Sequence, residues 1–226
     1  MRRAAFFDMD KTLLTVNTAR LYVAHQWHQG KARRRDVAMV SWWLLRYALG
    51  VLDAETVARQ LARPWAGVDE AAVRDETRAW VERAVLPTLS AAGLREVEAR
   101  RRAGDLCVLL TSSTVYAATP VADAVGIAHV LASRLSVHEG RFTGEIELPF
   151  CYREGKVAAA ERWAAAHDVS LDASSFFTDS ISDLPMLLRV GEPVVVNPDL
   201  RLGLEARRRG WPVQHWREVA PRRAAG

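Results

Sequence analysis

The chain has 226 residues, of which 50% are hydrophobic and 26% are charged, and its formal net charge is +4. These values are typical of a globular enzyme with one full core and a smaller second lobe. The modest positive excess comes from dispersed arginines and does not predict a nucleic-acid partner, and Cys107 and Cys151 lack the spacing of a metal site.

Two apolar stretches bear on the cellular location. Residues 4–7 are too short a run for the hydrophobic region of a secretory signal. Residues 37–52 form a longer apolar segment, but it falls short of the ~20 residues of a spanning helix, and Arg46 interrupts it. We therefore expect a cytoplasmic protein without membrane contact, in which 37–52 is a buried helix. The alternative is a surface that handles an apolar or lipid-like substrate or touches a membrane.

The first half of the chain is predicted to be one strand followed by helices. Residues 4–8 form a short apolar run that ends in an acid, which is consistent with a buried strand of a parallel sheet. Residues 16–103 lack strand-like alternation, and Asp69 is a plausible helix start. Pro87 marks a break, after which a helix is predicted over 90–103.

Strands and helices alternate in the second half. The predicted strands are 106–110, 131–137, 142–148, 175–178, 193–196 and 212–215, and the predicted helices are 115–125, 156–167, 184–189 and one that ends at 209. Strands 131–137 and 142–148 flank Glu139-Gly140 as in a hairpin. The alternation predicts an α/β fold with a doubly wound parallel sheet. Residues 1–15 and 88–226 would form this core, and 16–87 would be a small all-helical cap inserted after the first strand.

Polar side chains follow the predicted strands at the edge where open parallel sheets gather their functional groups. They are Asp8, Asp10 and Thr12 after the first strand, Thr111, Ser112 and Ser113 after the second, Lys156 at the start of a helix, and Asp179 and Asp183 after 175–178. This inventory suits phosphoryl transfer, which needs a nucleophile, a proton donor and positive charge around the phosphoryl oxygens.

The chemistry of these groups suggests how they divide the work. Asp8 and Asp10 lie two residues apart at a strand end, so they can reach opposite sides of one phosphate. Because carboxylates repel phosphate, a cation must lie between them, and Asp8 and Asp179 supply the oxygen ligands that Mg²⁺ prefers. Lys156 adds a second positive charge. The hydroxyl of Thr111, or of a serine that follows it, can bond the remaining phosphoryl oxygens.

These motifs resemble those of the haloacid dehalogenase superfamily, in the subgroup that includes phosphoserine phosphatase. They are DMDKT at 8–12, the apolar strand that ends in Thr111, Lys156, and DSISD at 179–183, and they occur in the order of that family. Thr178 stands where the family usually has glycine. The resemblance implies a magnesium-dependent phosphatase with a Rossmann-like core and a small helical cap.

The resemblance also implies a role for each acid. Asp8 would be the nucleophile that forms an aspartyl-phosphate, and Asp10 would protonate the leaving alcohol and then activate the attacking water. Mg²⁺ would be held by Asp8, the backbone carbonyl of Asp10, and Asp179, while Asp183 would act through water or hydrogen bonds. Thr111, Ser112 and Lys156 would bind the phosphate.

The substrate is expected to be a small-molecule phosphate ester. In phosphoserine phosphatases a glutamate binds the substrate amine, and the corresponding position here is Asn17, whose amide cannot pair with an ammonium as a carboxylate does. Phosphoserine and histidinol phosphate both stay open. The candidates for contacts with the leaving group are Asn17, Arg20, Tyr22, Trp42, Trp43, Arg46 and Tyr47.

Three alternatives to a phosphatase stay open. One is a phosphotransferase or mutase that passes the phosphoryl group to another alcohol. A second is a non-enzymatic phospho-acceptor, which Asp10 disfavours because an acid two residues after the nucleophile promotes hydrolysis. The third is a catalytically inactive module at a membrane surface.

Overall fold

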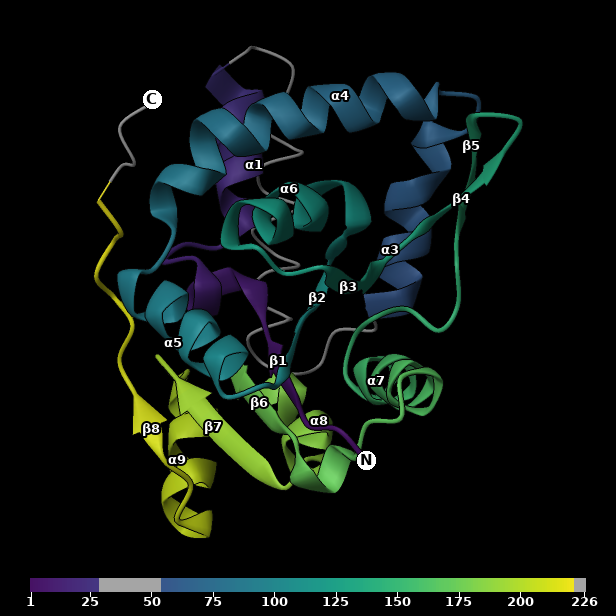
Figure 1. Ribbon diagram of the computed structural model, residues 1–226. Coiled ribbons are helices and arrows are strands. Elements are labelled where there is room, and N and C mark those ends of the chain that lie inside the picture. Colours follow the sequence, from purple (N-terminus) through teal and green to yellow (C-terminus); the bar gives the residue numbers. More distant parts are fainter. Residues whose placement is uncertain (29–53, 222–226) are drawn as a thin grey trace.

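The computed structural model describes residues 1–28 and 54–221. Its centre is a six-stranded parallel sheet with the order β3-β2-β1-β6-β7-β8 (Figure 1). The strands are β1 (Ala4–Phe7), β2 (Leu106–Thr114), β3 (His129–Ser133), β6 (Ser175–Thr178), β7 (Glu192–Val196) and β8 (Val213–Gln214). The first strand lies in the middle and the chain winds outward from it in both directions, so the predicted doubly wound sheet is confirmed.

Helices cover both faces of this sheet. Helices α5 (Ala91–Arg102) and α6 (Val115–Val125) lie on one face, and α7 (Glu154–Ala166), α8 (Leu184–Arg189) and α9 (Leu200–Arg209) lie on the other. The remaining described α-helices are α1 (Thr18–His28), α3 (Ala54–Ala62) and α4 (Glu70–Trp80). Ala5 and Phe7 of β1 belong to the core that includes α5 and α6, whereas Ala4 and Phe6 belong to the core that includes α7, α8 and α9. Burial on both faces explains why β1 is apolar at every position.

The helices α1, α3 and α4 lie between β1 and β2 in the sequence and form the upper part of the molecule in Figure 1. Asp69 caps α4, because its side chain accepts a hydrogen bond of 2.9 Å from the N–H of Ala72, as the sequence predicted. The apolar segment 37–52, with Arg46, Trp42, Trp43 and Tyr47, lies outside the described residues. No helix in the described ranges is both long and apolar enough to cross a membrane.

Two strand predictions were wrong in their bounds. The segment 131–137 is not one strand: β3 ends at Ser133 and pairs with β2 in the parallel sheet, and β4 (Leu135–His138) begins a separate hairpin with β5 (Arg141–Ile146). Strand β2 continues beyond Leu110 to Thr114, with a register shift against β3 between these residues. Thr111, Ser112 and Ser113, which were expected after the second strand, therefore lie within the last residues of β2, where its pairing with β3 is irregular.

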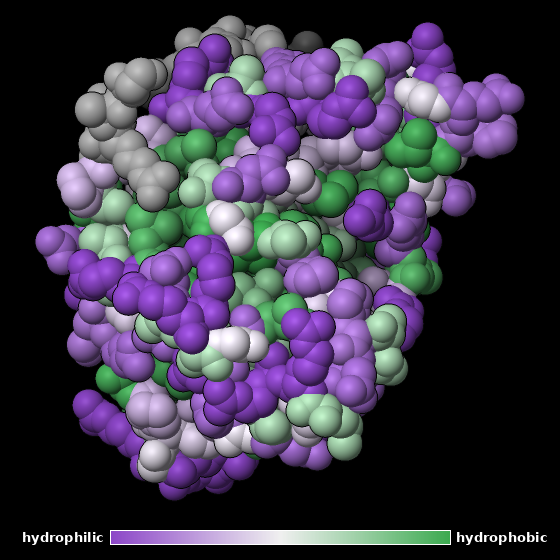
Figure 2. Space-filling view, in the orientation of Figure 1, coloured by the Kyte–Doolittle hydropathy of each residue, from purple (hydrophilic) through white to green (hydrophobic). Residues whose placement is uncertain are grey.

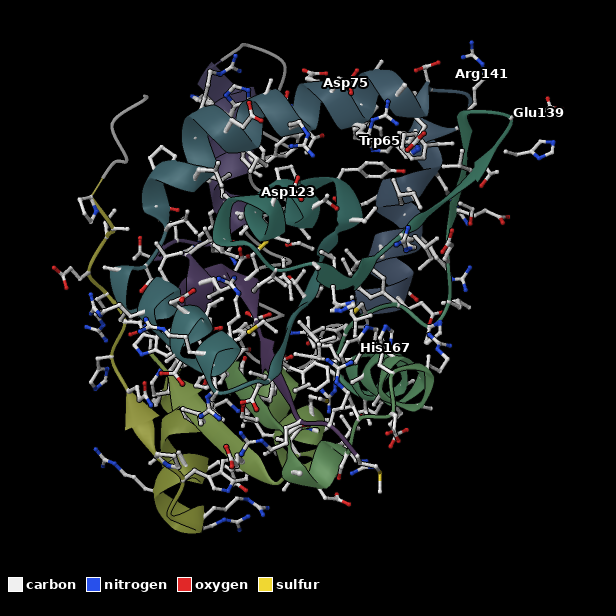
Figure 3. All side chains as sticks on the ribbon, in the orientation of Figure 1. Trp65, Asp75, Asp123, Glu139, Arg141 and His167 are labelled. Carbon is white, nitrogen blue, oxygen red and sulfur yellow. The ribbon has the colours of Figure 1, made fainter. Side chains whose placement is uncertain are left out.

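The hairpin β4–β5 packs against the helical insert. Phe142 accepts a hydrogen bond of 2.8 Å from the N–H of Gly67 and donates one of 3.0 Å to the carbonyl of Val68. The side chain of Arg141 also donates to the carbonyl of Gly67 at 2.7 Å, and Trp65 packs edge-on against Phe142 near the upper end of the hairpin (Figure 3). The face of the molecule that is turned to the viewer in Figure 1 is mostly hydrophilic, with hydrophobic residues gathered below α4 (Figure 2).

Candidate active site

The strand ends bring the predicted acids to one edge of the sheet. Phe7 pairs with Leu109 on one side and with Phe177 on the other, so the residues that follow β1, β2 and β6 emerge together. The N–H of Asp8 donates a hydrogen bond of 2.9 Å to the carbonyl of Phe177, which fixes the first residue of the loop. Asp8 and Asp179 are both about 93% buried, with 7% of each exposed.

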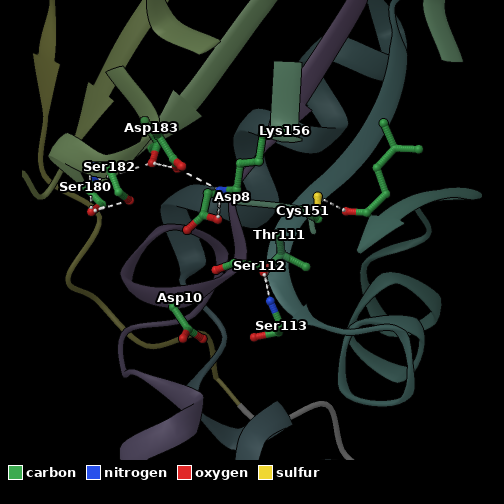
Figure 4. Close-up of polar contacts among 12 residues, drawn as sticks. Asp8, Asp10, Thr111, Ser112, Ser113, Cys151, Lys156, Ser180, Ser182 and Asp183 are labelled. Carbon is green, nitrogen blue, oxygen red and sulfur yellow. Dashed lines mark hydrogen bonds and ion pairs between the residues drawn. The ribbon is translucent and has the colours of Figure 1, made fainter. Parts of the chain in front are cut away.

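Lys156 joins two of these acids. Its Nζ lies 2.8 Å from Oδ1 of Asp8 and 2.8 Å from Oδ2 of Asp183, and the lysine is 2% exposed (Figure 4). The hydroxyl of Thr178 donates a further hydrogen bond of 2.6 Å to the same Oδ2. A buried ammonium with carboxylate partners avoids the large penalty of an isolated buried charge. The threonine that replaces the usual glycine thus fixes Asp183.

Lys156 lies in the first turn of α7, and a tight approach of the chain just before this helix directs the lysine toward Asp8 and Asp183. A side chain at Gly155 would place its Cβ 1.8 Å from the carbonyl oxygen of Phe150, so this position has room only for glycine. The helix begins at Glu154, two residues before the predicted start.

Asp10 is held by residues at the start of α1. Its Oδ2 accepts hydrogen bonds from the amide of Asn17 at 3.0 Å and from the hydroxyl of Thr18 at 3.1 Å, and its Oδ1 accepts one from the N–H of Thr18 at 3.1 Å. The other end of the Asn17 side chain accepts a hydrogen bond of 3.1 Å from the N–H of Arg20. Both polar ends of Asn17 are therefore engaged within the protein.

Three hydroxyl residues lie along the end of β2. Thr111 is 2% exposed, and its hydroxyl oxygen accepts a hydrogen bond of 3.2 Å from the N–H of Ser113. The hydroxyls of Ser113 and Thr18 are 3.4 Å apart, which connects this strand end to the group that holds Asp10. Ser112 accepts from the hydroxyl of Ser133 at 2.9 Å through its carbonyl. Figure 4 draws Thr111 and Ser112 next to Asp8.

A second lysine, Lys11, lies at the same edge. Its Nζ is 3.7 Å from Oδ2 of Asp179, and half of its side chain is exposed. Its backbone adopts a left-handed conformation, with φ of 53°. The two lysines therefore differ: Lys156 is buried between Asp8 and Asp183, whereas Lys11 approaches Asp179 from the surface.

Burial makes these acids unusually weak. It raises the pKa of Asp8 from 3.8 to about 7, and the nearby ammonium of Lys156 counteracts part of that rise. Burial also raises the pKa of Asp10 from 3.8 to about 6, against the hydrogen bonds from Thr18. The pKa of Asp179 is raised well above 3.8 by burial and by the neighbouring charge of Asp8. Asp10 can therefore hold or release a proton near neutral pH.

The acids fit a divalent cation. Oδ1 of Asp183 is buried and has no hydrogen-bond partner among the described residues, and Asp8 lies close enough to raise the pKa of Asp179. In the part of the chain that the structure describes, no three side chains of histidine, cysteine, aspartate or glutamate form a metal-binding group by themselves. A cation here would bind two carboxylates directly, with a backbone carbonyl and waters completing the shell, as Mg²⁺ often does.

Sequence reasoning missed three contributors to this site: Thr18, Lys11 and Thr178. The only signal for Thr18 was its place after an asparagine at the start of a helix, which indicates a cap rather than a partner of Asp10. Asn17 was expected near the leaving group, but its amide is turned to Asp10. Arg46 was expected there too, and it lies outside the described residues.

Comparison with known proteins shows which sequences this chain is similar to. A family model described as haloacid dehalogenase-like hydrolase matches residues 5–188. A probable phosphatase of Mycobacterium tuberculosis (strain ATCC 25618 / H37Rv) is 35% identical over 215 residues, covering 94% of this chain and 75% of the relative. A histidinol-phosphatase of Neisseria meningitidis serogroup C (strain 8013) is 28% identical over 222 residues, covering 96% of this chain and 100% of the relative.

Solved structures show the same fold. A protein with unknown function from Bordetella pertussis Tohama I superposes with a TM-score of 0.84 at 30% identity, covering 95% of this chain and 98% of that one. A phosphoserine phosphatase, solved as an analogue of its phospho-aspartyl intermediate, superposes with a TM-score of 0.69 at 16% identity, covering 96% of this chain and 94% of the other.

Proposed function

The chain belongs to the haloacid dehalogenase-like hydrolase family and is a phosphatase, and on that premise we propose that it hydrolyses a small-molecule phosphate monoester through a phosphorylated Asp8. The observation that carries the proposal is the contact of Lys156 with Asp8 at 2.8 Å, beside an acid, Asp10, whose carboxyl is held separately by Asn17 and Thr18. The carboxylate of Asp8 thus contacts a cation, whereas the carboxyl group of Asp10 is bound by neutral hydrogen-bond donors.

In the first half-reaction, Asp8 attacks the phosphorus of the bound ester. Its Oδ1 is held by Lys156, so Oδ2 is the oxygen that forms the new bond. The bond between phosphorus and the leaving oxygen breaks, and Asp10 gives its proton to that oxygen, so the alcohol leaves neutral. With a pKa of about 6, Asp10 is a stronger proton donor than an alcohol and still carries its proton in part of the population near neutral pH.

In the second half-reaction, water attacks the phosphorus of the aspartyl-phosphate. Asp10, now ionised, takes the proton of that water, the bond between phosphorus and Asp8 breaks, and inorganic phosphate leaves. Both steps leave Asp10 in the state that the other step requires. The donors from Asn17 and Thr18 bind the carboxylate of Asp10 at 3.0–3.1 Å and keep it at one position through the cycle.

Mg²⁺ would be held by the side chains of Asp8 and Asp179 and by the backbone carbonyl of Asp10, and Asp183 would bind through water. When bound, the ion offsets the negative charge of the phosphate beside these acids. Thr111, Ser112 and Lys156 would bind the phosphoryl oxygens. We place the leaving group under the helical insert, residues 16–87, which would act as the cap of the core formed by 1–15 and 88–226.

The proposal favours a leaving group that needs no carboxylate from position 17. Asn17 has its oxygen on the N–H of Arg20 and its amide on Asp10, so its side chain is not available to bind an ammonium of the substrate. Histidinol phosphate, the substrate named for one relative, and phosphoserine both carry an ammonium group, so a residue other than Asn17 would have to bind that group in either case. Both belong to the same class of small phosphate monoesters.

The experiment is a screen of phosphate release from metabolite phosphates with Mg²⁺, including histidinol phosphate and phosphoserine, on the wild type and Asp8→Asn. Asp8→Asn should abolish release while the protein stays folded. Asp75→Asn, at an acid 74% exposed on α4, is the matched control and should keep activity. Phosphate release by Asp8→Asn at the wild-type rate would show that Asp8 is not the nucleophile. Transfer to an added alcohol instead of water would identify a phosphotransferase.

A further inference from the structure

Lys11 has a fixed backbone. Its N–H donates a hydrogen bond of 3.0 Å to the carbonyl of Val16, and its own carbonyl accepts one of 2.8 Å from the side-chain amide of Asn197, which follows β7. The same Asn197 side chain accepts a hydrogen bond of 2.9 Å from the N–H of Trp216. The left-handed φ of 53° is one that a lysine adopts rarely, so the surrounding structure imposes it.

This turn directs a cation toward Asp179. The ammonium of Lys11 is 3.7 Å from Oδ2 of Asp179, which is too long for a hydrogen bond but within the range of an ion pair. The lysine side chain is 50% exposed and the aspartate side chain 10%, so an exposed cation faces a nearly buried carboxyl group. No other ion pair of Asp179 occurs among the described residues.

A divalent cation bound to Asp179 would bring two positive charges next to the ammonium of Lys11. The two cations cannot occupy the same side of this carboxylate without repulsion. Lys156 also pairs with a proposed metal ligand, Asp8, but it is 2% exposed and bound to both Asp8 and Asp183 at 2.8 Å, so it is held in place. Lys11 is half exposed and unbonded at its ammonium, so it is the cation that can move away.

We propose that Lys11 is a tethered counter-ion of Asp179 that the divalent cation displaces, so that Lys11 stabilises the metal-free site and weakens metal binding. This inference rests on the proposed function, because it takes Asp179 as a metal ligand. It assigns Lys11 a positioning role toward the metal-free acids and no contact with the substrate. It also gives the imposed backbone conformation a purpose, which is to hold the lysine within reach of Asp179.

The test measures Mg²⁺ binding without substrate, by calorimetric titration of the metal-free wild type, Lys11→Gln, Lys11→Arg and Lys11→Gly. Lys11→Gln removes the charge and should bind Mg²⁺ about fivefold more tightly than the wild type at low salt. Lys11→Arg keeps the charge and should resemble the wild type. Arg83→Gln, at an exposed arginine of the insert, makes the same change in net charge and should leave the affinity unchanged.

Two further readouts separate charge from structure. The gain in Lys11→Gln should shrink in about 1 M salt, because screening then acts within ~3 Å. Mg²⁺ should raise the melting temperature of Lys11→Gln more than that of the wild type, because tighter binding to the folded state gives greater stabilisation. A merely structural lysine would change the melting temperature equally with and without Mg²⁺.

Each remaining outcome decides a separate point. Unchanged or weaker binding by Lys11→Gln would overturn the role of Lys11 while leaving the proposed function intact. Tighter binding by Lys11→Gly alone would overturn it as well, because the backbone and not the charge would then be responsible. A wild type that binds no Mg²⁺ would instead contradict the metal site of the proposed function.

Discussion

Thr18 donates two hydrogen bonds to the carboxyl of Asp10, one from its N–H to Oδ1 and one from its hydroxyl to Oδ2, each 3.1 Å long. Thr18 is the first residue of α1, and α1 is the first α-helix after β1. The start of the helical insert therefore also positions the acid that we assign to proton transfer. The N–H comes from a helix N-terminus, where a negative charge is stabilised.

We expect Thr18→Val to impair proton transfer without disturbing the fold. Valine keeps the shape and the backbone N–H but loses the hydroxyl donor, so Asp10 is held less firmly. Turnover of an alkyl phosphate should fall about tenfold, in line with the loss of one hydrogen bond to a charged group. Formation of the phosphoenzyme from p-nitrophenyl phosphate should fall less, because this leaving group needs little protonation.

Thr18→Ser retains the hydroxyl and should restore most of the activity. The comparison is made by single-turnover kinetics with the two esters, and thermal melting shows whether the variant is folded. An equal loss with both esters would mean that Thr18 acts on the fold alone and not through Asp10.

Asp8 and Asp179 should make the metal-free protein sensitive to pH. Burial raises the pKa of Asp8 from 3.8 to about 7 and that of Asp179 well above 3.8. Between about pH 4 and about pH 7 the folded protein keeps protons that the unfolded chain releases. The free energy of unfolding should therefore fall as the pH rises through this window, opposite to the usual behaviour of paired carboxylates.

The measurement is denaturant unfolding in a chelator at about pH 5.5 and about pH 7.5. Asp8→Asn is the reference, because it removes one of the two acids and, with it, the neighbouring charge that helps to raise the pKa of Asp179. The wild type should lose on the order of 2 kcal/mol more than the variant between these values. Saturating Mg²⁺ should abolish the difference in the wild type. A stability that rises equally with pH in both proteins would contradict the raised pKa values.

The elements that form the active-site edge of the sheet could largely be predicted from the sequence, because short apolar runs that indicate strands end there in polar residues. The bounds of β6 and α8 agree with the prediction, and the helix predicted over 90–103 begins and ends within a residue of α5. Each of these elements has a strong local signal, such as Ser90, whose side chain caps α5 by accepting from the N–H of Gly93.

The remaining features depend on contacts between distant segments. No local sequence signal marks a strand boundary between Ser133 and Leu135. Ser133 nevertheless ends a strand of the parallel sheet and Leu135 begins the hairpin, because β3 pairs with β2 whereas β4 pairs with β5. The ion pair of Lys11 and Asp179 joins residues 168 positions apart, as their numbers show, and depends on Asn197 at a third strand end. The periodicity of hydrophobic residues along the sequence carries no information on such a long-range contact.

Lys156 should contribute to stability as well as to function. Lys156→Met removes the ammonium that is 2.8 Å from both Asp8 and Asp183, and leaves two buried carboxylates without their cation. The metal-free protein should lose about 3–5 kcal/mol of unfolding free energy. Asp183→Asn should lose less, and the double variant should be less destabilised than the sum of the single changes, because the two residues interact directly. Additive losses in urea unfolding would show that the contact carries no energy.

Gly155 and Gly203 offer a matched test of how the backbone places Lys156. A methyl group at Gly155 would lie 1.8 Å from the carbonyl oxygen of Phe150, whereas at Gly203, inside α9, the nearest atom is 3.7 Å away, on Pro198. Gly155→Ala should therefore move the start of α7, destabilise the protein by at least about 2 kcal/mol and abolish turnover. Gly203→Ala should raise the free energy of unfolding by about 0.5–1 kcal/mol, because alanine favours the helix, and should leave turnover unchanged. Urea unfolding and phosphate release on both variants measure this. If Gly155→Ala retained wild-type stability and turnover, the tight approach of residues 150 and 155 could not be what carries Lys156 to Asp8.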